Sequence, residues 1–261
     1  MRPFNRCFWQ ASLYLLAITF SAPLAAKPRV LHFVTHPCPP DSYEQNGRAA
    51  GPMVEILALA CARIGIDCQT QILPWRRALS LVEQGSVEGI FSIVDIPERQ
   101  YQLRLLRPVL SLRYAFFAPP DSKFSYTNPD SLRGHKIAAY GPSGVSSVLL
   151  DAVKTQPETQ VSVVLDNPTA FKMLVAGRFG RDGLVLANED VALNLMANPS
   201  FQGVKEVGVN KNLTHTIGLS RANNSIDPEL AKSFNQALFK LCREGVVGQI
   251  AIRHGVRAAP C

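Results

Sequence analysis

The sequence predicts an α/β protein in which two lobes face each other across a cleft. Three observations support this fold. Strands and helices alternate along the chain, the alternation starts again near residue 114, and the last helices need a partner in the first lobe. The order β-α-β-α-β favours parallel strands with helices on both faces. With 261 residues, the chain is long enough for two lobes of roughly 100 residues each.

The first series begins with an apolar, β-rich strand at residues 30–35. A helix is expected at 51–64, because its apolar residues recur at helical spacing and Gly65 follows where a helix end favours positive φ. The series continues with a strand at 67–73, a helix at 77–84 and a strand at 87–94.

The second series contains six expected strands, at 114–118, 136–140, 161–165, 183–187, 204–209 and 214–219. The helices between them are expected at 145–153, 167–176 and 189–196. Asn167-Pro168 has the pattern of an N-cap followed by proline in the first turn. A long final helix is expected to open at Asp227-Pro228-Glu229, with a short one at 246–253.

Two crossings between the lobes follow from this order. The chain passes into the second lobe near 113–117 and returns near 214–219. We therefore expect one lobe from 27–113 plus 217–261 and another from 114–216. Two crossing segments make a hinge, and ligands of open α/β sheets bind beyond the carboxyl ends of the strands.

The N-terminus has the pattern of a secretory signal peptide over residues 1–26. Arg2 and Arg6 precede an apolar run at 11–20, and small residues follow at 21–26. A membrane-spanning helix needs about 20 apolar residues, so the run is too short for an anchor. Cleavage is expected near Ala26.

The formal charge of +7 falls by two when Arg2 and Arg6 are removed. The remaining basic residues are scattered, which indicates a solvated basic surface and no nucleic-acid partner. Because the cysteines are dispersed and the histidines lack ligand spacing, we expect no metal site and no cofactor.

Five cysteines remain after the signal peptide, and export places them in an oxidising compartment. We favour a disulfide between Cys61 and Cys68 across a helix end, and a second between Cys242 and Cys261 around the C-terminal tail. Cys38 is then left over. Buried thiols are the alternative, because connectivity does not follow from sequence.

Several stretches, in order, resemble the bacterial extracellular solute-binding proteins of family 3, which serve importers of polar amino acids and related compounds. The sharpest is Ile96-Pro97-Glu98-Arg99, which is similar to the family's Thr-Pro-Glu-Arg signature. The likeness covers nearly all of the expected mature chain. The other stretches that carry it are residues 51–57, 73–79, 84–90, 107–109 and 243–245.

The resemblance implies a periplasmic-binding-protein-like (type II) fold and a periplasmic location. It implies a monomeric protein, not an enzyme, that captures a small carboxylate-bearing solute, an amino acid or a related compound. Capture would occur by hinge closure, and the closed form would be presented to the membrane permease of an ABC importer.

The resemblance assigns Arg99 to the ligand's carboxylate. A guanidinium fork matches a carboxylate bidentately and stays charged. A surface arginine paired with Glu98 is the alternative. Ser92, near the end of the third strand, corresponds to a position where the family often places a hydroxyl or backbone donor. The alternative for Ser92 is a buried serine whose hydroxyl is hydrogen-bonded to the backbone.

The loop at 141–146 opens a helix in the second lobe, and Ser143, Gly144 and Ser146 are expected to face an anion there. Ordinary N-capping by these serines is compatible with that role. The loop lacks the Gly-Lys-Ser/Thr of a P-loop. Trp75 and Tyr43 are expected to stack on an apolar or cationic part of the ligand. A buried core position is the alternative for Trp75.

Asn188 is the largest departure from the family, which usually has an aspartate here for the ligand's α-ammonium. Either Glu189 supplies the counter-charge, or the ligand is not an α-amino acid. A dehydratase-like enzyme of the same fold is an alternative function, with Glu189 as its general acid. A ligand sensor for a membrane receptor is another.

Overall fold

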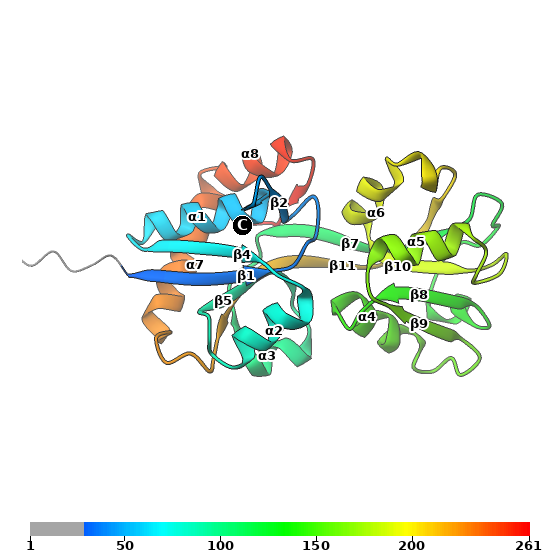
Figure 1. Cartoon of the computed structure of the whole chain (residues 1–261), viewed down its shortest axis with the longest axis horizontal. Coiled ribbons are helices and arrows are strands. Elements are labelled where there is room, and N and C mark those ends of the chain that lie inside the picture. Colours follow the sequence, from blue (N-terminus) through cyan, green and yellow to red (C-terminus); the bar gives the residue numbers. More distant parts are fainter. Residues whose placement is uncertain (1–28) are drawn as a thin grey trace, which may run out of the picture.

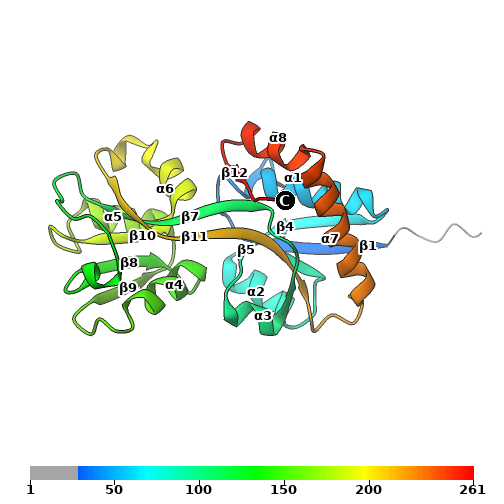
Figure 2. The same cartoon turned by 180° about the vertical axis from the view of Figure 1, so that it is seen from behind.

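Two lobes lie side by side in the computed structural model, joined by two long strands (Figure 1). The structure describes residues 29–261, so the signal peptide expected at 1–26 lies outside the described residues. The connecting strands are β7 (Leu110–Ala118) and β11 (Lys205–Ser220). They pair antiparallel with each other and pass from one lobe into the other, which is the arrangement of a two-strand hinge (Figure 2).

Lobe 1 holds both chain ends of the described region. Its strands are β1 (Val30–Thr35), β2 (Tyr43–Gln45), β3 (Arg48–Ala50), β4 (Asp67–Ile72), β5 (Gly89–Val94), β6 (Leu103–Leu105) and β12 (Arg257–Ala258). Its helices are α1 (Pro52–Arg63), α2 (Trp75–Glu83), α3 (Pro97–Gln102), α7 (Pro228–Arg243) and α8 (Val246–Arg253).

Lobe 2 contains the middle of the chain. Its strands are β8 (Lys136–Tyr140), β9 (Gln160–Val164) and β10 (Leu184–Asn188), and its helices are α4 (Gly144–Val153), α5 (Asn167–Val175) and α6 (Glu189–Met196). Short 3₁₀ turns lie at Pro129–Leu132 and Pro199–Phe201. The exact lobe boundaries expected at 113/114 and 216/217 stay a prediction.

One continuous sheet runs through both lobes in the order β4-β1-β5-β11-β7-β10-β8-β9. β1 pairs parallel with β4 and β5 in lobe 1, and β8 pairs parallel with β9 and β10 in lobe 2. The antiparallel strands β7 and β11 lie between these parallel groups. The carboxyl ends of the parallel strands of each lobe therefore meet where the lobes meet.

Apolar side chains are buried on both faces of the sheet. In lobe 1, α1, α7 and α8 cover one face, where the ring centroids of Phe33 and Phe234 lie 5.9 Å apart. α2 covers the other face with Trp75, Ala78 and Val82. Lobe 2 has a core on each face as well. One of these lobe 2 clusters also takes in Val94 and Ile96 of lobe 1, so side chains of the two lobes pack against each other beside β7.

Several details differ from the sequence prediction, which did not contain α3, β6 and β12. The two strands expected at 204–209 and 214–219 are one continuous strand, β11, because its ladder with β7 continues through the polar residues Lys211 and Asn212. The N-cap of α5 is Asp166, which accepts a hydrogen bond from Thr169 N, and Asn167 is already helical. The β2–β3 hairpin was not expected.

Two disulfides lie in lobe 1, and they are the pairs favoured by the sequence. Cys61–Cys68 joins the end of α1 to β4, and Cys242–Cys261 fastens the C-terminal residue to α7. Cys38 is buried and in no disulfide. Within residues 29–261, no helix has both the length and the apolar character needed to cross a bilayer.

Candidate functional site

A cavity lies between the lobes at the carboxyl ends of the strands, with walls from both lobes. Lobe 1 supplies residues from the loop after β1, from α2, from β5 and from α3. Lobe 2 supplies residues from β8 and from the first turns of α4, α5 and α6. The side chains on its wall are His36, Cys38, Trp75, Ser92, Ile93, Val94, Arg99, Tyr114, Tyr140, Ser143, Gly144, Val145, Asn167, Asn188, Val191 and His215.

Arg99 and Trp75 form one wall of the cavity. The guanidinium carbon of Arg99 lies 5.0 Å from the centroid of the Trp75 ring, which is the geometry of a cation–π contact. Burial lowers the pKa of Arg99, while Glu83 and Glu98 raise it. Within residues 29–261, Arg99 forms no ion pair, so its positive charge is available to a ligand.

His36, in the loop after β1, fills the space between Trp75 and Tyr140. Its ring meets Trp75 edge-on at 4.9 Å and stacks on Tyr140 at 6.3 Å between centroids. Burial, together with the charges of His215 and Arg99, lowers the pKa of His36 to about 3. His36 is therefore a neutral ring that links the two lobes at neutral pH.

Ser92 lies on the same wall and has an unusual backbone. Its φ is 56°, a left-handed value that is uncommon for a residue with a side chain. The side chain is buried, and its hydroxyl donates to Ser42 Oγ at 3.1 Å. The ladder between β5 and β11 shifts register at this point, and Ser92 lines the cavity.

The first turn of α4 faces the cavity from lobe 2. Ser143 caps the helix by accepting from Val145 N at 3.2 Å, and Ser146 Oγ accepts from Ser143 N at 2.8 Å. These bonds form a capping box, so the two hydroxyls are used within the helix. Gly144 presents only backbone to the cavity, so the positive end of the helix remains open to an anion.

Asn188 sits at the end of β10 and caps α6. Its Oδ1 accepts from Asp190 N at 3.0 Å, which leaves Nδ2 buried without a hydrogen-bond partner. The amide group therefore offers a donor to the cavity. An amide N–H at this position can donate to an oxygen atom of a ligand, and it does not repel a ligand carboxylate. A ligand ammonium group would find no negative charge at Asn188.

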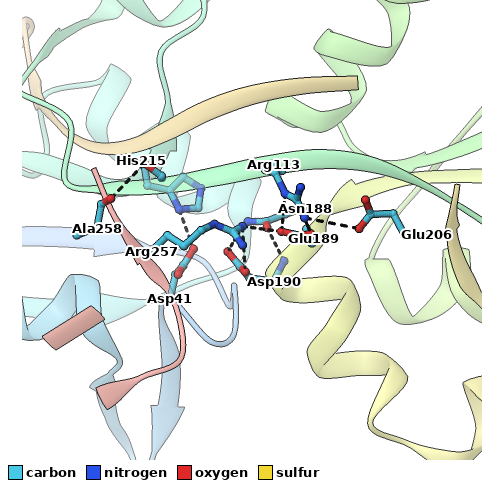
Figure 3. Close-up of polar contacts among 10 residues, drawn as sticks. Asp41, Arg113, Asn188, Glu189, Asp190, Glu206, His215, Arg257 and Ala258 are labelled. Atoms are coloured by element: carbon cyan, nitrogen blue, oxygen red, sulfur yellow. Dashed lines mark hydrogen bonds and ion pairs between the residues drawn. The ribbon is translucent and has the colours of Figure 1, made fainter. Parts of the chain in front are cut away.

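Glu189 is not among the residues that line the cavity, and its carboxylate contacts Arg113 and Arg257 (Figure 3). Its buried carboxylate accepts from Arg113 Nε at 2.9 Å and from Arg257 Nη2 at 2.6 Å. Arg257 also reaches Asp190 at 3.3 Å, and burial raises the pKa of Asp190. Glu189 is thus held in an ion-pair network beside the hinge.

Unpaired polar atoms concentrate around this one cavity. Buried polar atoms in proteins nearly always have hydrogen-bond partners. Six buried side-chain atoms of the described residues have none, and five of the six belong to residues on the cavity wall. Those five atoms are His36 Nδ1, Trp75 Nε1, Asn167 Oδ1, Asn188 Nδ2 and His215 Nδ1. This concentration marks the cavity as a site built for a polar ligand.

Most of the residues expected from the sequence lie on the wall: Trp75, Ser92, Arg99, Ser143, Gly144 and Asn188. The structure places Ser146 inside the capping box and Glu189 in the ion-pair network, while Tyr43 is half-buried in β2, off the cavity wall. Sequence reasoning did not assign His36, Tyr140 and Asn167. Tyr140 is the last residue of β8, and Asn167 is the first residue of α5, which follows β9. Both therefore lie at the carboxyl end of a strand, and this position is the signal in the sequence that could have identified them.

A model of the bacterial extracellular solute-binding proteins, family 3, matches residues 31–256 of this chain. Three solved structures are similar at TM-scores of 0.75, 0.73 and 0.70. The first is a histidine kinase sensor domain with similarity to periplasmic binding proteins (20% identity, covering 89% of this chain and 99% of that one). The second is an ancestral arginine-binding protein bound to arginine (20% identity, covering 86% of this chain and 97% of that one).

The third is an ancestral amino acid-binding protein, a precursor of cyclohexadienyl dehydratase (16% identity, covering 86% of this chain and 94% of that one). No curated protein matches the chain. At these identities the likeness establishes the shared fold, which spans nearly the whole length of the similar chains.

Proposed function

Because this chain belongs to the bacterial extracellular solute-binding proteins, family 3, we propose that it captures a small carboxylate-bearing solute in the periplasm for an ABC importer. Four buried polar atoms around the interlobe cavity that have neither a hydrogen bond nor an ion pair carry this proposal, those of His36, Trp75, Asn167 and Asn188. His215 Nδ1 is not counted with them, because it lies 2.8 Å from Asp41 Oδ2. A ligand that paired with them would remove the cost of burying them alone. Closure of the lobes about β7 and β11 would then be stabilised by ligand contacts from both sides.

The charge of the cavity favours an anion. Among the described residues, no aspartate or glutamate lines it, whereas the Arg99 guanidinium does. The donors Trp75 Nε1–H and Asn188 Nδ2–H and the open end of α4 add to the same preference. We therefore infer that the ligand is an organic acid. It either lacks an α-ammonium group or binds with that group away from Asn188.

The alternative of a dehydratase-like enzyme depends on a carboxylic acid in the cleft. Glu189, the candidate for that role, is paired with Arg113 and Arg257 and does not line the cavity. A pair of guanidinium groups keeps a carboxyl ionised, which is the wrong state for a general acid. The described residues therefore favour binding over catalysis.

A thermal-shift screen of the mature protein tests the ligand class. We expect mono- and dicarboxylic acids to raise the melting temperature, because a ligand at 100 times its Kd adds about 2.7 kcal/mol to stability. Simple amines should have no effect. Stabilisation by amines or by neutral sugars alone would contradict the proposal.

A second experiment separates import from sensing. Deletion of the gene should abolish uptake of the radiolabelled solute found in the screen if the protein feeds an importer. A sensor would instead leave uptake intact and change the transcriptional response to that solute.

A further inference from the structure

Three side chains with metal-binding atoms meet beside the cavity floor: Cys38, Asp41 and His215. Their ligand atoms all lie within 4.8 Å of one another, and all three residues are buried, at 8%, 2% and 4% exposure. Cys38 and Asp41 come from the loop after β1, and His215 comes from β11. The carboxylate and the imidazole are seen facing each other in Figure 3.

The backbone holds Cys38 and Asp41 in one tight turn. Cys38 O accepts from Asp41 N at 2.8 Å and from Ser42 N at 3.1 Å, and Cys38 N donates back to Ser42 O at 2.7 Å. The turn packs against the start of α1, where a Cβ on Gly51 would lie 2.6 Å from Asp41 O. The two side chains are therefore fixed in position before any ligand binds.

His215 approaches Asp41 without forming a hydrogen bond. Its Nδ1 lies 2.8 Å from Asp41 Oδ2, yet this nitrogen has no partner of hydrogen-bond geometry. The two groups therefore form a buried ion pair, and their separation is shorter than that of two ligands of one metal ion. His215 is held there by pairing of β11 with both β5 and β7.

We propose that Cys38 Sγ, Asp41 Oδ2 and His215 Nδ1 form a three-ligand site for zinc or a similar borderline divalent transition metal. Thiolate, carboxylate and imidazole are the groups that zinc takes in proteins. In a tetrahedral site with bonds of about 2.0–2.3 Å, ligand atoms lie roughly 3.3–3.6 Å apart. The ligand atoms of the cluster all lie within 4.8 Å of one another, and a bound metal would move Asp41 Oδ2 and His215 Nδ1 apart from their present 2.8 Å.

Charge and access agree with this site. A thiolate and a carboxylate neutralise a divalent cation, which removes the cost of a buried, uncompensated charge. Cys38 and His215 also line the interlobe cavity, so the fourth position faces the place where a solute or water oxygen enters. Sequence spacing did not reveal the site, because His215 joins the Cys38–Asp41 turn only through the hinge strand.

Metal titration tests the site without any organic solute, so its outcome is independent of the proposed transport function. The mature protein, made without a histidine tag and stripped with chelator, is titrated with Co²⁺ and then Zn²⁺. We expect a thiolate-to-cobalt charge-transfer absorption and visible d–d bands, both abolished by Zn²⁺. Ca²⁺ and Mg²⁺ should not compete, because they prefer oxygen ligands.

Variants identify the ligands. Cys38→Ser should abolish the charge-transfer band, and His215→Asn should weaken zinc binding at least about tenfold. His254→Asn is the matched control, because His254 also contacts a carboxylate, Glu55, at 2.6 Å but has no cysteine beside it. Circular dichroism melts of the metal-free variants verify that each is folded.

Two results would overturn the site. One is the absence of cobalt absorption and of zinc affinity in the wild-type protein. The other is zinc affinity that Cys38→Ser leaves unchanged, which would reduce Asp41 and His215 to a structural ion pair. If His215→Asn does not fold, the Cys38→Ser variant and protection of the Cys38 thiol from alkylation by Zn²⁺ decide the question.

Discussion

Arg257 Nη2 lies 2.6 Å from Glu189 Oε2, and this contact ties lobe 1 to lobe 2 beside the hinge. Arg257 belongs to β12, which pairs with β7 at the lobe 1 end, while Glu189 begins α6 of lobe 2. The carboxylate is 4% exposed and the guanidinium 45% exposed. We therefore expect the pair to act as a latch that favours this arrangement of the lobes over a more open one.

Arg257→Ala should shift the free protein toward open lobes. The buried Glu189 keeps Arg113 but loses a charged hydrogen bond, and we expect a loss of about 1–2 kcal/mol from the closed form. Small-angle X-ray scattering should show a larger radius of gyration. Arg253→Ala is the control, because its partner Glu55 lies in the same lobe. Equal scattering of both variants and wild type would contradict the latch.

Arg99→Ala should weaken binding of an acidic solute by roughly tenfold or more. A hydrogen bond to a charged group contributes about 1.5–3 kcal/mol, and the described residues offer the ligand no second side-chain cation on the cavity wall. Isothermal titration calorimetry with the solute from the screen measures the loss. Arg77→Ala, on the exposed side of α2, should bind as wild type does. Unchanged affinity in the Arg99 variant would remove Arg99 from the site.

Asn188→Asp should change the ligand class from simple acids toward α-amino acids. Aspartate caps a helix as well as asparagine does, so α6 should form normally. The new carboxylate offers the ammonium a counter-charge and repels the carboxylate of a simple acid. Competition calorimetry should show the two classes moving in opposite directions. Asn188→Ser keeps the cap without the charge, and should weaken the simple acid without gaining the amino acid.

The fold followed from the sequence more completely than the site did. Strands and helices repeat a period over many residues, so single polar residues such as Asn212 interrupt the pattern without interrupting the ladder of β11. A site depends instead on where individual side chains point. Asn188 lines the cavity and Glu189 does not, although they are neighbours, because β10 ends at Asn188 and α6 begins at Glu189.

The residues that the sequence did not assign to the site were missed for a common reason. His36 and Asn167 are single polar residues at the ends of elements, where no periodicity marks them. Both residues are assigned to the site because a buried polar atom of each has no hydrogen-bond partner. That absence can be recognised only in a three-dimensional structure, where the neighbouring atoms have known positions. Cys38 likewise acquires His215 as a neighbour only through the hinge strand.

The stability of the protein should fall with pH in part through His36. Its pKa in the folded protein is about 3, below the ordinary value of 6.5, because burial disfavours the charged ring and His215 and Arg99 add to the effect. The unfolded chain therefore binds the proton first. Stability from this residue is complete above pH 6.5 and is lost as pH falls toward 3, by at most about 1.4 kcal/mol per pH unit.

Denaturant unfolding at pH 7, 6, 5 and 4 measures this loss. The free energy of unfolding is plotted against pH for wild type and for His36→Gln. The carboxylates titrate alike in both proteins, so the difference between the slopes of the two plots isolates the contribution of His36. The variant should lose less stability per pH unit than wild type does. Parallel curves would show that the His36 ring is solvated and titrates normally.

The lobes approach each other closely at Gly144, which offers a direct test of closure. A Cβ at Gly144 would lie 2.4 Å from Val94 Cγ2 of lobe 1 and 3.2 Å from Tyr114 Oη. Gly144→Ala should therefore force the lobes apart and weaken solute binding, while the helix itself gains from alanine. Calorimetry and small-angle scattering report the two effects.

Val94→Ala should rescue the Gly144→Ala variant, because it removes the methyl group that the new Cβ meets. Gly248→Ala in α8 is the matched control, since nothing lies within 4 Å of its would-be Cβ. It should bind as wild type does and unfold at a slightly higher temperature. Rescue by Val94→Ala would locate the obstruction between the lobes, whereas loss of binding that persists in the double variant would mean that the new Cβ obstructs the ligand or Tyr114 Oη instead of Val94.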